Sequence, residues 1–297
     1  MKKEFRISRL EKGVRLDKFI SLKVPELSRT KIGKMIEGGS ILVNGERKKS
    51  SYSLKEADLI TVSFLRGVTP VLKPYPLDID IVYEDEDIIV VNKPANLVVH
   101  PPSLACQNTL VNALIYMKKK LSSVSLERPG VVHRLDKETT GAMVFAKNNF
   151  SHLKLIESFR ERKVKKEYRA IVWDVIKRDR LLIDLPLRRD NRNRLKMKVS
   201  MFKAKSAITH IEVIKGFKGF SYIRIVILTG RMHQIRVHMN FLGHPILGDK
   251  KYGRKDGYDN LFLHSFKLGI YHPRTNKFME FKAPLPLWFN EVIEKNG

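Results

Sequence analysis

The segment His133-Arg134-Leu135-Asp136-Lys137-Glu138-Thr139-Thr140-Gly141 is the most informative part of this 297-residue sequence. It places one carboxylate, Asp136, between two cations, Arg134 and Lys137, just ahead of a Thr-Thr-Gly turn. Nearby positive charge favours the ionised form of a carboxyl group. Such a carboxylate can act as a nucleophile or a base toward an electrophilic sugar carbon. Taken alone, the motif is more often an ordinary turn with a surface ion pair, so its meaning depends on the rest of the chain.

The charge of the chain indicates the class of its partner. The sequence has 57 Lys and Arg against 31 Asp and Glu, a formal net charge of +26 and a pI near 10.1. Such a field attracts polyanions, and its self-repulsion is costly unless a polyanion relieves it. We therefore expect nucleic acid as the partner, with anionic membrane surfaces as the alternative.

The same sequence argues against several locations. No stretch approaches the ~18 consecutive apolar residues of a membrane-spanning helix. The first residues do not lead into the apolar core of a secretory signal. Cys106 is the single cysteine, which excludes an intrachain disulfide and suits a reducing cytosol. We expect a cytoplasmic protein with no membrane partner.

Residues 1–74 predict a small separate module. Leu16, Phe19 and Ile20 have helical spacing, and a second helix from a Ser28 cap to Ile36 carries the basic residues Arg29, Lys31 and Lys34. Residues 41–43 predict a strand that enters an Asn44-Gly45 hairpin turn, and residues 59–62 predict a further strand of the same sheet. The proline-punctuated residues 68–76 predict a linker.

Residues 75–297 predict a second, α+β domain built on a mixed sheet. The expected strands are 79–83, 88–91, 142–146, 168–173, 181–185 and 221–228, and the expected helices are 109–120, 151–160 and 235–242. Along the last of these strands, Ile223, Ile225 and Ile227 alternate, so one face should be buried. The helix at 151–160 should bury Leu155, Ile156 and Phe159.

A second motif is Leu228-Thr229-Gly230-Arg231-Met232-His233-Gln234-Ile235-Arg236-Val237-His238-Met239. It predicts a strand end followed by a helix from which Arg236 could reach a carboxylate. His233 and His238 invite a metal interpretation, but five residues at ~100° each leave them about 140° apart around a helix. We therefore expect no metal site. His233 is as compatible with a structural hydrogen bond as with a place near a substrate.

A third motif, Val164-Lys165-Lys166-Glu167-Tyr168-Arg169-Ala170-Ile171-Val172, puts Lys166, Tyr168 and Ala170 on one strand face. Alone, Tyr168 is most simply a half-buried strand tyrosine. Together, in this order, the three motifs resemble the RluA-type pseudouridine synthase family. Asn92-Lys93-Pro94 before them, with Leu263-His264, His272-Pro273 and Ala283-Pro284 after them, extend the likeness over about Leu77 to Trp288. Met232 and Ser265 depart from the residues usual in the family.

The N-terminal module resembles the S4 RNA-binding domain. This combination is similar to the large-ribosomal-subunit branch of the family, and most closely to its D-type members, which modify helix 69 of 23S-type rRNA. The resemblance implies an isomerase that breaks the N1–C1′ bond of an RNA uridine, rotates the base and rejoins it through C5 without a cofactor. The partner would be large-subunit rRNA, free or in pre-ribosomal particles, and the protein would act as a monomer.

The resemblance also implies roles for individual residues. Asp136 would be catalytic, either attacking C1′ or removing a sugar proton, with Arg236 as its ion-pair partner. Tyr168 would stack on the target base and take part in proton transfer at C5. Arg134 would fill the stack vacated by the extruded nucleotide. His133 and Ile235 would contact the substrate in the pocket. The basic residues Arg29, Lys31, Lys34, Arg188 and Arg194 would grip phosphates.

Three alternatives stay open at this stage. The first is a tRNA pseudouridine synthase. The second is a non-catalytic rRNA-binding assembly factor, which explains the charge but not Asp136 and its neighbouring basic motifs. The third is a phosphodiesterase that uses His133 and Asp136, which strand cleavage would reveal.

Overall fold

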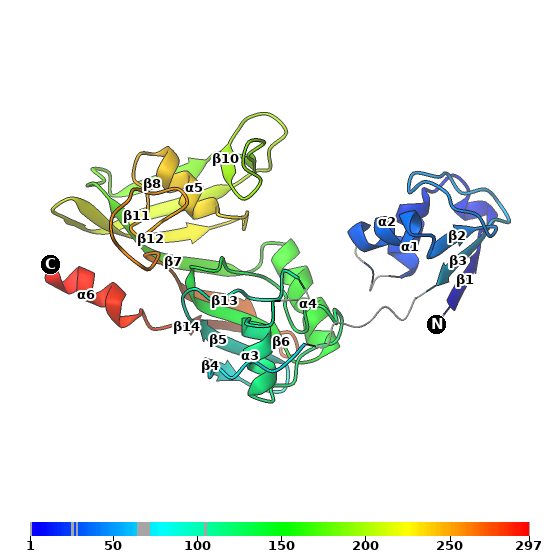
Figure 1. Cartoon of the computed structure of the whole chain (residues 1–297), viewed down its shortest axis with the longest axis horizontal. Helices are drawn as coiled ribbons and strands as arrows, with labels where there is room; N and C mark the ends of the chain where they lie inside the picture. The colour runs from blue at the N-terminus through cyan, green and yellow to red at the C-terminus, as the bar shows by residue number, and fades with distance from the viewer. Residues whose placement is uncertain (1, 25–26, 28, 64–71, 104–105, 297) are drawn as a thin grey trace. The chain divides into compact units, whose positions relative to one another are not determined.

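The computed structural model describes residues 2–24, 27, 29–63, 72–103 and 106–296, with only the backbone at 30 and 31. The chain divides into two compact units, Met1–Val71 and Leu72–Gly297 (Figure 1). This division lies close to the boundary that we expected after residue 74. Part of the expected linker, residues 68–71, lies outside the described residues.

The N-terminal unit is a small α+β fold with one apolar core. Its elements are β1 (Lys2–Arg6), a 3-10 turn η1 (Arg9–Glu11), α1 (Leu16–Lys23), α2 (Arg29–Glu37), β2 (Ile41–Val43) and β3 (Leu59–Ser63). The strands form an antiparallel sheet in the order β1-β3-β2. Leu16, Phe19 and Ile20 of α1 are buried as the helical spacing predicted, and they share the core with Ile32 and Ile36 of α2. The cap expected at Ser28 lies outside the described residues.

The Asn44-Gly45 turn adopts the geometry that its sequence predicts. Asn44 and Gly45 both have positive φ, 54° and 79°, and the backbone groups of Val43 and Glu46 hydrogen-bond to each other across the turn. Two positive φ angles are what a type I′ hairpin turn requires. The partner strand differs from a simple hairpin, because β2 pairs with β3 rather than with the residues directly after the turn.

The C-terminal unit is organised by one large mixed sheet. Its strands are β4 (Asp80–Glu84), β5 (Ile88–Lys93), β6 (Thr140–Ala146), β7 (Lys165–Trp173), β8 (Arg180–Asp184), β11 (Ile208–Phe217), β12 (Phe220–Ile227), β13 (Leu263–Tyr271) and β14 (Phe278–Lys282). The order is β4-β5-β6-β13-β7-β12-β11-β8, with β14 also paired to β13. The β6–β13 pair is parallel and the others are antiparallel. This mixed sheet confirms the α+β prediction.

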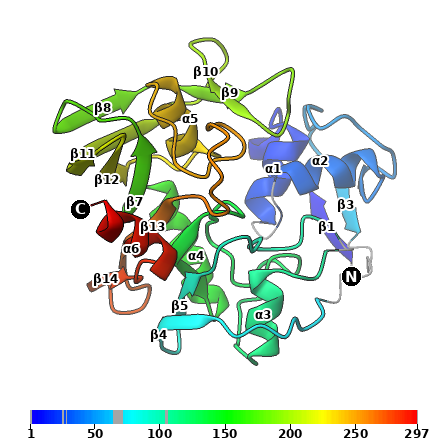
Figure 2. The same ribbon diagram turned by 60° about the vertical axis from the view of Figure 1, so that its left-hand side comes forward.

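Four helices and a short hairpin accompany the described part of this sheet. The helices are α3 (Leu110–Tyr116), α4 (Asn149–Arg160), α5 (Gln234–Phe241) and α6 (Leu287–Lys295). The hairpin pairs β9 (Leu187–Arg189) with β10 (Met197–Val199). Figures 1 and 2 both show α5 beside this hairpin, at the end of the sheet that carries β8, β11 and β12.

Several predicted elements have different limits in the structure. The helix expected to reach residue 120 ends at Tyr116, and Lys118 follows with a positive φ of 55°. The helix expected from residue 151 starts at Asn149, because the Asn148 side chain accepts the Ser151 N–H at 2.9 Å and caps the helix. That helix buries Leu155, but the expected burial of Ile156 is wrong, since 41% of it is exposed. Ile223, Ile225 and Ile227 are buried as predicted.

Gly141 allows the two central parallel strands to meet. Its φ is +107°, which L side chains rarely adopt, and a Cβ there would collide with the backbone oxygen and nitrogen of Ser265 on β13. Thr140 and Gly141 therefore begin β6 rather than form the expected turn, and the strand needs glycine at position 141. This fixes where the loop that carries Asp136 enters the sheet.

Candidate active site

A small pocket collects the residues that the three motifs singled out. Arg134 and Asp136 come from the loop before β6, Tyr168 from β7, and Ile235 and Arg236 from α5. All five line the same cavity of about 70 Å³.

Asp136 meets its charged partners through one carboxylate oxygen. Oδ2 lies 3.6 Å from Arg236 Nη1 and 3.9 Å from His233 Nε2, and 18% of the side chain is exposed. The two sequence neighbours expected to surround Asp136 with positive charge do not pair with it. Among the ion pairs of the described residues, none joins Asp136 to Arg134 or Lys137, whose side chains are exposed. The cation beside Asp136 thus comes from α5 and not from its sequence neighbours.

Arg236 is a buried cation with three carboxylate neighbours. Its Nε and Nη2 donate to Asp249 Oδ2 and Oδ1 at 2.8 and 2.7 Å, and Nη1 lies 3.2 Å from Glu138 Oε2. Burial opposes the charge, but the hydrogen bonds and charge of Asp249, with the charges of Asp136 and Glu138, outweigh it and raise the pKa of Arg236. The bidentate pair with Asp249 fixes the direction in which Nη1 points.

A second buried basic side chain, Lys93, supports the Asp136 loop, and burial lowers its pKa to about 7 against the charges of Asp136 and Glu138. The ammonium group of Lys93, fully buried at the end of β5, donates to the carbonyl oxygens of Pro94, Leu97 and Lys137 at 2.8, 2.8 and 2.9 Å. The three bonds use all three of its donors. Because Lys137 follows Asp136 directly, Lys93 ties the loop that carries Asp136 to the sheet.

Tyr168 is buried in the pocket wall, with 8% of its surface exposed. Burial and the nearby charge of Asp136 raise the pKa of Tyr168, while a hydrogen bond with Ser265 opposes this shift. Its hydroxyl is therefore protonated at neutral pH and can donate or relay a proton. Ile235, 4% exposed, supplies an apolar side of the same pocket.

His133, predicted to contact the substrate, is not among the residues that line this pocket. Its ring stacks on Phe159 of α4 with centroids 4.6 Å apart, and Nε2 accepts the Val144 N–H at 3.1 Å. Burial, with the charge of Lys166, lowers its pKa to about 3. Both contacts turn the imidazole toward β6 and α4. These contacts hold the imidazole in place, and no hydrogen bond or ion pair of the described residues joins His133 to Asp136.

The two histidines of the second motif face different neighbours, but His233 precedes α5, so the helical angle used in the prediction does not apply to it. His238 contacts Thr209 Oγ1 and the Leu185 carbonyl at 2.9 Å each. His233 turns to the pocket, where Nδ1 lies 2.7 Å from the hydroxyl of Tyr252 and Nε2 faces Asp136. The sequence left the role of His233 open, and the structure puts it beside the candidate catalytic carboxylate.

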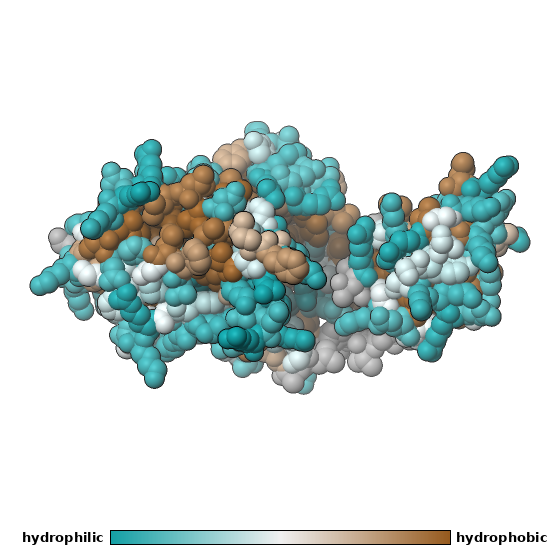
Figure 3. Space-filling model, turned by 90° about the horizontal axis from the view of Figure 1, so that it is seen from above, coloured by the Kyte–Doolittle hydropathy of each residue, from teal (hydrophilic) through white to brown (hydrophobic). Residues whose placement is uncertain are grey.

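The basic residues predicted to grip phosphates lie on separate surfaces. Arg29 and Lys34 belong to α2 of the N-terminal unit, and the side chain of Lys31 lies outside the described atoms. Arg188 is part of β9, and Arg194 is exposed in the loop between β9 and β10. The face in Figure 3 shows hydrophilic side chains over most of both units, with an apolar area on the C-terminal unit.

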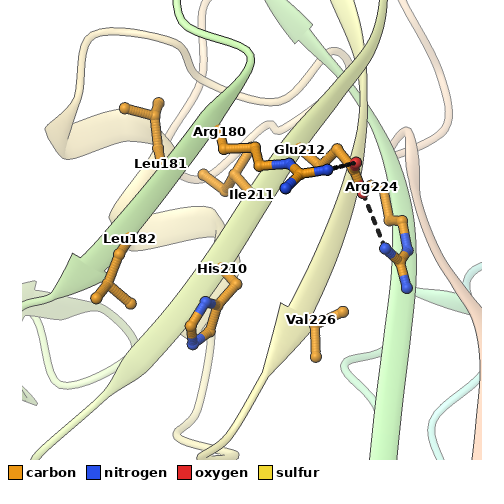
Figure 4. Close-up of a pocket in the computed structure, with 8 residues that line it drawn as sticks. All are labelled: Arg180, Leu181, Leu182, His210, Ile211, Glu212, Arg224 and Val226. Carbon is orange, nitrogen blue, oxygen red and sulfur yellow. Dashed lines mark hydrogen bonds and ion pairs between the residues drawn. The ribbon is translucent and has the colours of Figure 1, made fainter.

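Two other features could be mistaken for the active site. A cavity of about 420 Å³ lies over β8, β11 and β12, where Arg180 and Arg224 both pair with Glu212 at 3.3 and 2.8 Å (Figure 4). The charged side chains that line this cavity already form ion pairs with one another. Asp85, Asp87 and His272 also lie within possible metal-binding distance. Their side chains are engaged with protein donors and acceptors, including the Asp85–His272 and Asp87–Arg274 pairs.

Comparison with known proteins decides the family. The family model described as RNA pseudouridylate synthase matches residues 87–241, and the S4 domain model matches residues 14–60. The chain belongs to the RNA pseudouridylate synthase family. A Bacillus subtilis protein named uncharacterized RNA pseudouridine synthase YlyB is 39% identical over 293 residues, 97% of this chain and 96% of its own length.

Other relatives carry more specific names. Ribosomal large subunit pseudouridine synthase D of Neisseria meningitidis (strain Z2491) is 38% identical over 92% of this chain and 76% of its own length. The protein of that name from Pasteurella multocida is 35% identical over 98% and 93%. The solved structure of human RNA pseudouridylate synthase domain containing 4 is 27% identical, with a TM-score of 0.59 over 73% of this chain and 92% of that chain.

These findings confirm the family predicted from the motifs, including the S4 domain. They also identify the chain as an RNA pseudouridine synthase, which is an isomerase. In the described part of the chain, no helix is long and apolar enough to cross a membrane.

Proposed function

We propose that this enzyme converts specific uridines of large-subunit rRNA to pseudouridine, with Asp136 as the catalytic carboxylate. The observation that carries the residue assignment is the convergence of Asp136, Arg236 and Tyr168 on one pocket. The rRNA target rests on the names of the Neisseria and Pasteurella relatives, which align over most of this chain. Within large-subunit rRNA, helix 69 is the proposed site, from the likeness to D-type members.

In this proposal, Asp136 acts on the ribose of an extruded uridine, by attack on C1′ or by removal of a sugar proton. The N1–C1′ bond breaks, the uracil turns, and C5 bonds to C1′ as the Asp136–C1′ bond breaks or the sugar proton returns. C5 then loses its proton, and N1 gains one. The uridine and the product contain the same atoms, so no co-reactant is consumed. Arg236 holds Asp136 from one side, and the ring of Tyr168 lies in the wall against which the base would stack.

The remaining residues serve substrate entry and grip. Arg134 is exposed at the rim of the pocket, where its planar guanidinium can take the place of the base that leaves the RNA stack. Arg29, Lys31 and Lys34 of the S4 domain, with Arg188 and Arg194 of the β9–β10 hairpin, would bind phosphates. These contacts position the RNA without reading its sequence. We further propose that the enzyme acts as a cytoplasmic monomer.

Carbodiimide-dependent reverse-transcription stops test the target directly. Total RNA is compared between cells that contain this protein and cells in which its gene is deleted. Loss of stops in helix 69 of large-subunit rRNA supports the full proposal. Loss of stops only in tRNA would replace the rRNA target, and an unchanged pattern would favour the assembly-factor alternative. Repeating the reaction on free rRNA and on isolated subunits identifies the form that is modified.

A further inference from the structure

Tyr252 connects the β9–β10 hairpin to the active site. Its hydroxyl oxygen accepts the backbone N–H of Met197 at 2.7 Å and lies 2.7 Å from His233 Nδ1. The edge of its ring packs against the imidazole, with centroids 5.5 Å apart, and the guanidinium of Arg236 lies 5.5 Å from the ring centre. None of the three sequence motifs contains this tyrosine, and it does not line the pocket.

We infer that Tyr252 and His233 form a positioning pair, in which the tyrosine hydroxyl donates its proton to His233 Nδ1 and so fixes an Nε2–H aimed at Asp136. This inference rests on the proposed role of Asp136. It concerns residues that act on the carboxylate and not on the RNA.

The backbone N–H of Met197 determines which way the Tyr252 hydroxyl donates its proton. Met197 N–H can only donate, so it occupies a lone pair of the Tyr252 oxygen. The hydroxyl proton then has His233 Nδ1 as its acceptor among the contacts described for this oxygen. The opposite assignment, with the proton on Nδ1, would leave the tyrosine proton without an acceptor in a half-buried site, which is unfavourable.

The contact of His233 Nε2 with Asp136 also indicates that the proton lies on Nε2. Nε2 lies 3.9 Å from Asp136 Oδ2. A neutral imidazole with its proton on Nδ1 would turn the lone pair of Nε2 toward a carboxylate oxygen, whereas a proton on Nε2 makes the approach attractive. Burial lowers the pKa of His233, so the neutral ring is the form present at neutral pH. A separation of 3.9 Å in the free enzyme can shorten when substrate binds.

The backbone conformation of His233 also indicates a functional position. Its φ and ψ are 54° and 21°, in the left-handed region, directly before α5. Few residues with side chains adopt this conformation, although histidine is enriched there, and such conformations cluster at functional sites.

The consequence of this geometry concerns the two oxygens of Asp136. The contacts of Arg236 and His233 both fall on Oδ2. Because both N–H groups lie on the side of Oδ2, at 3.6 and 3.9 Å in the free enzyme, we expect Oδ1 to be the oxygen that approaches the ribose. Tyr252 and His233 thus orient the carboxylate, and they touch neither base nor sugar.

Nitrogen NMR of the free enzyme tests the tautomer without RNA or activity. Protein labelled with ¹⁵N-histidine has nine histidines, and the His233 signals are assigned by their loss in His233→Gln. We expect a protonated Nε2 and an unprotonated Nδ1 in the wild type, and a mixture of tautomers in Tyr252→Phe. A protonated Nδ1 in the wild type, or a spectrum unchanged by Tyr252→Phe, would overturn the inference even if the enzyme modifies rRNA.

A double-mutant cycle tests the connection to catalysis. The readout is the single-turnover rate of tritium release from an unmodified large-subunit rRNA transcript that carries [5-³H]uridine, with RNA affinity measured separately. His233→Ala and Tyr252→Phe should each slow this rate by about tenfold without weakening RNA binding. His233→Gln, whose side-chain amide can still donate to Asp136 and has no tautomers, should be slowed less than His233→Ala.

The cycle also separates this role from loss of the Met197 contact. Tyr252→Phe should have no further effect in the His233→Gln background, because no tautomer remains to be selected. If its effect is the same in both backgrounds, Tyr252 acts by holding the hairpin, and the positioning role is wrong.

Discussion

Arg236 binds Asp249 more closely than it binds Asp136. Two hydrogen bonds of 2.7 and 2.8 Å join the guanidinium to Asp249, whereas Asp136 Oδ2 is 3.6 Å from Nη1. The arginine next to the proposed catalytic carboxylate is thus held by a different acid, 13 residues further along the chain. Asp136 is left with only a weak hold on the cation, which suits a group that must also act on substrate.

Asp249→Asn should therefore damage both stability and activity. The substitution removes the charge opposite a guanidinium that is 2% exposed. Loss of one partner of a buried ion pair costs about 3–5 kcal/mol. We expect a fall of this size in the free energy of unfolding by denaturant, together with slower single-turnover pseudouridine formation. Asp259→Asn is the matched control, because Asp259 is 96% exposed in its pair with Lys250. Equal effects of the two substitutions would contradict the role given to Asp249.

Lys93→Met tests the support beneath the catalytic loop. Methionine keeps an apolar chain of similar length but leaves the three carbonyl oxygens that Lys93 binds without their donor. Each unpaired buried acceptor costs about 1–3 kcal/mol. We expect lower stability in denaturant unfolding and a slower reaction, because the Lys137 carbonyl is freed from the sheet. Lys137→Met, which changes an exposed side chain of the same loop, should leave stability unchanged; a comparable loss there would argue against the anchor.

The main features of the fold could be predicted from the sequence where one signal dominated. The alternating isoleucines of β12, the spacing of α1 and the Asn44-Gly45 turn each gave a correct local structure. β13 was missed because it lies in the interior of the sheet and includes polar residues that the tertiary structure satisfies. His264, for instance, lies 2.8 Å from Thr140 Oγ1. β1 was missed because its five residues include four charged ones, and only pairing with β3 makes it a strand.

The candidate site could be predicted only in part. Asp136, Tyr168 and Arg236 were found because each belongs to a motif. Lys93 was quoted within a motif, but its three carbonyl acceptors depend on loop conformation. Asp249 and Tyr252 gave no signal, because their partners are set by how α5 packs. The substrate contact of His133 stays a prediction, because sequence proximity to Asp136 does not reveal which side of the loop the imidazole occupies.

Acid should destabilise the protein partly through Asp87. The hydrogen bonds and charge of Arg274, with hydrogen bonds from Ser151 and Asn148, hold the pKa of Asp87 well below its usual range. A folded-state pKa below the unfolded value gives stability that is present above the unfolded pKa of about 3.9 and is lost as pH falls further. In Asp87→Asn, the free energy of unfolding should be lower at pH 7 and should decline less between pH 5 and the acid transition. An acid limb identical to that of the wild type would disprove this assignment.

Binding to rRNA should depend on salt, in part through the β9–β10 loop. Arg194 is exposed there, and each phosphate contact contributes roughly 0.7–0.9 to the slope of log affinity against log salt. Arg194→Ala should weaken binding and reduce this slope by about one contact. Arg180→Ala is the control, because Arg180 is 82% exposed and paired with Glu212 on β11. If both variants change the slope equally, the loop is not a specific phosphate contact.

The most direct measurement for the whole account is the activity of Asp136→Ala on unmodified large-subunit rRNA. Pseudouridine formation is followed by tritium release from [5-³H]uridine, and RNA affinity is measured in parallel. Asp174→Ala, which removes a half-exposed carboxylate paired with Arg254, serves as the control. The account predicts that Asp136→Ala binds the RNA with nearly unchanged affinity and forms no pseudouridine, while the control remains active. Continued pseudouridine formation by Asp136→Ala would contradict the central claim.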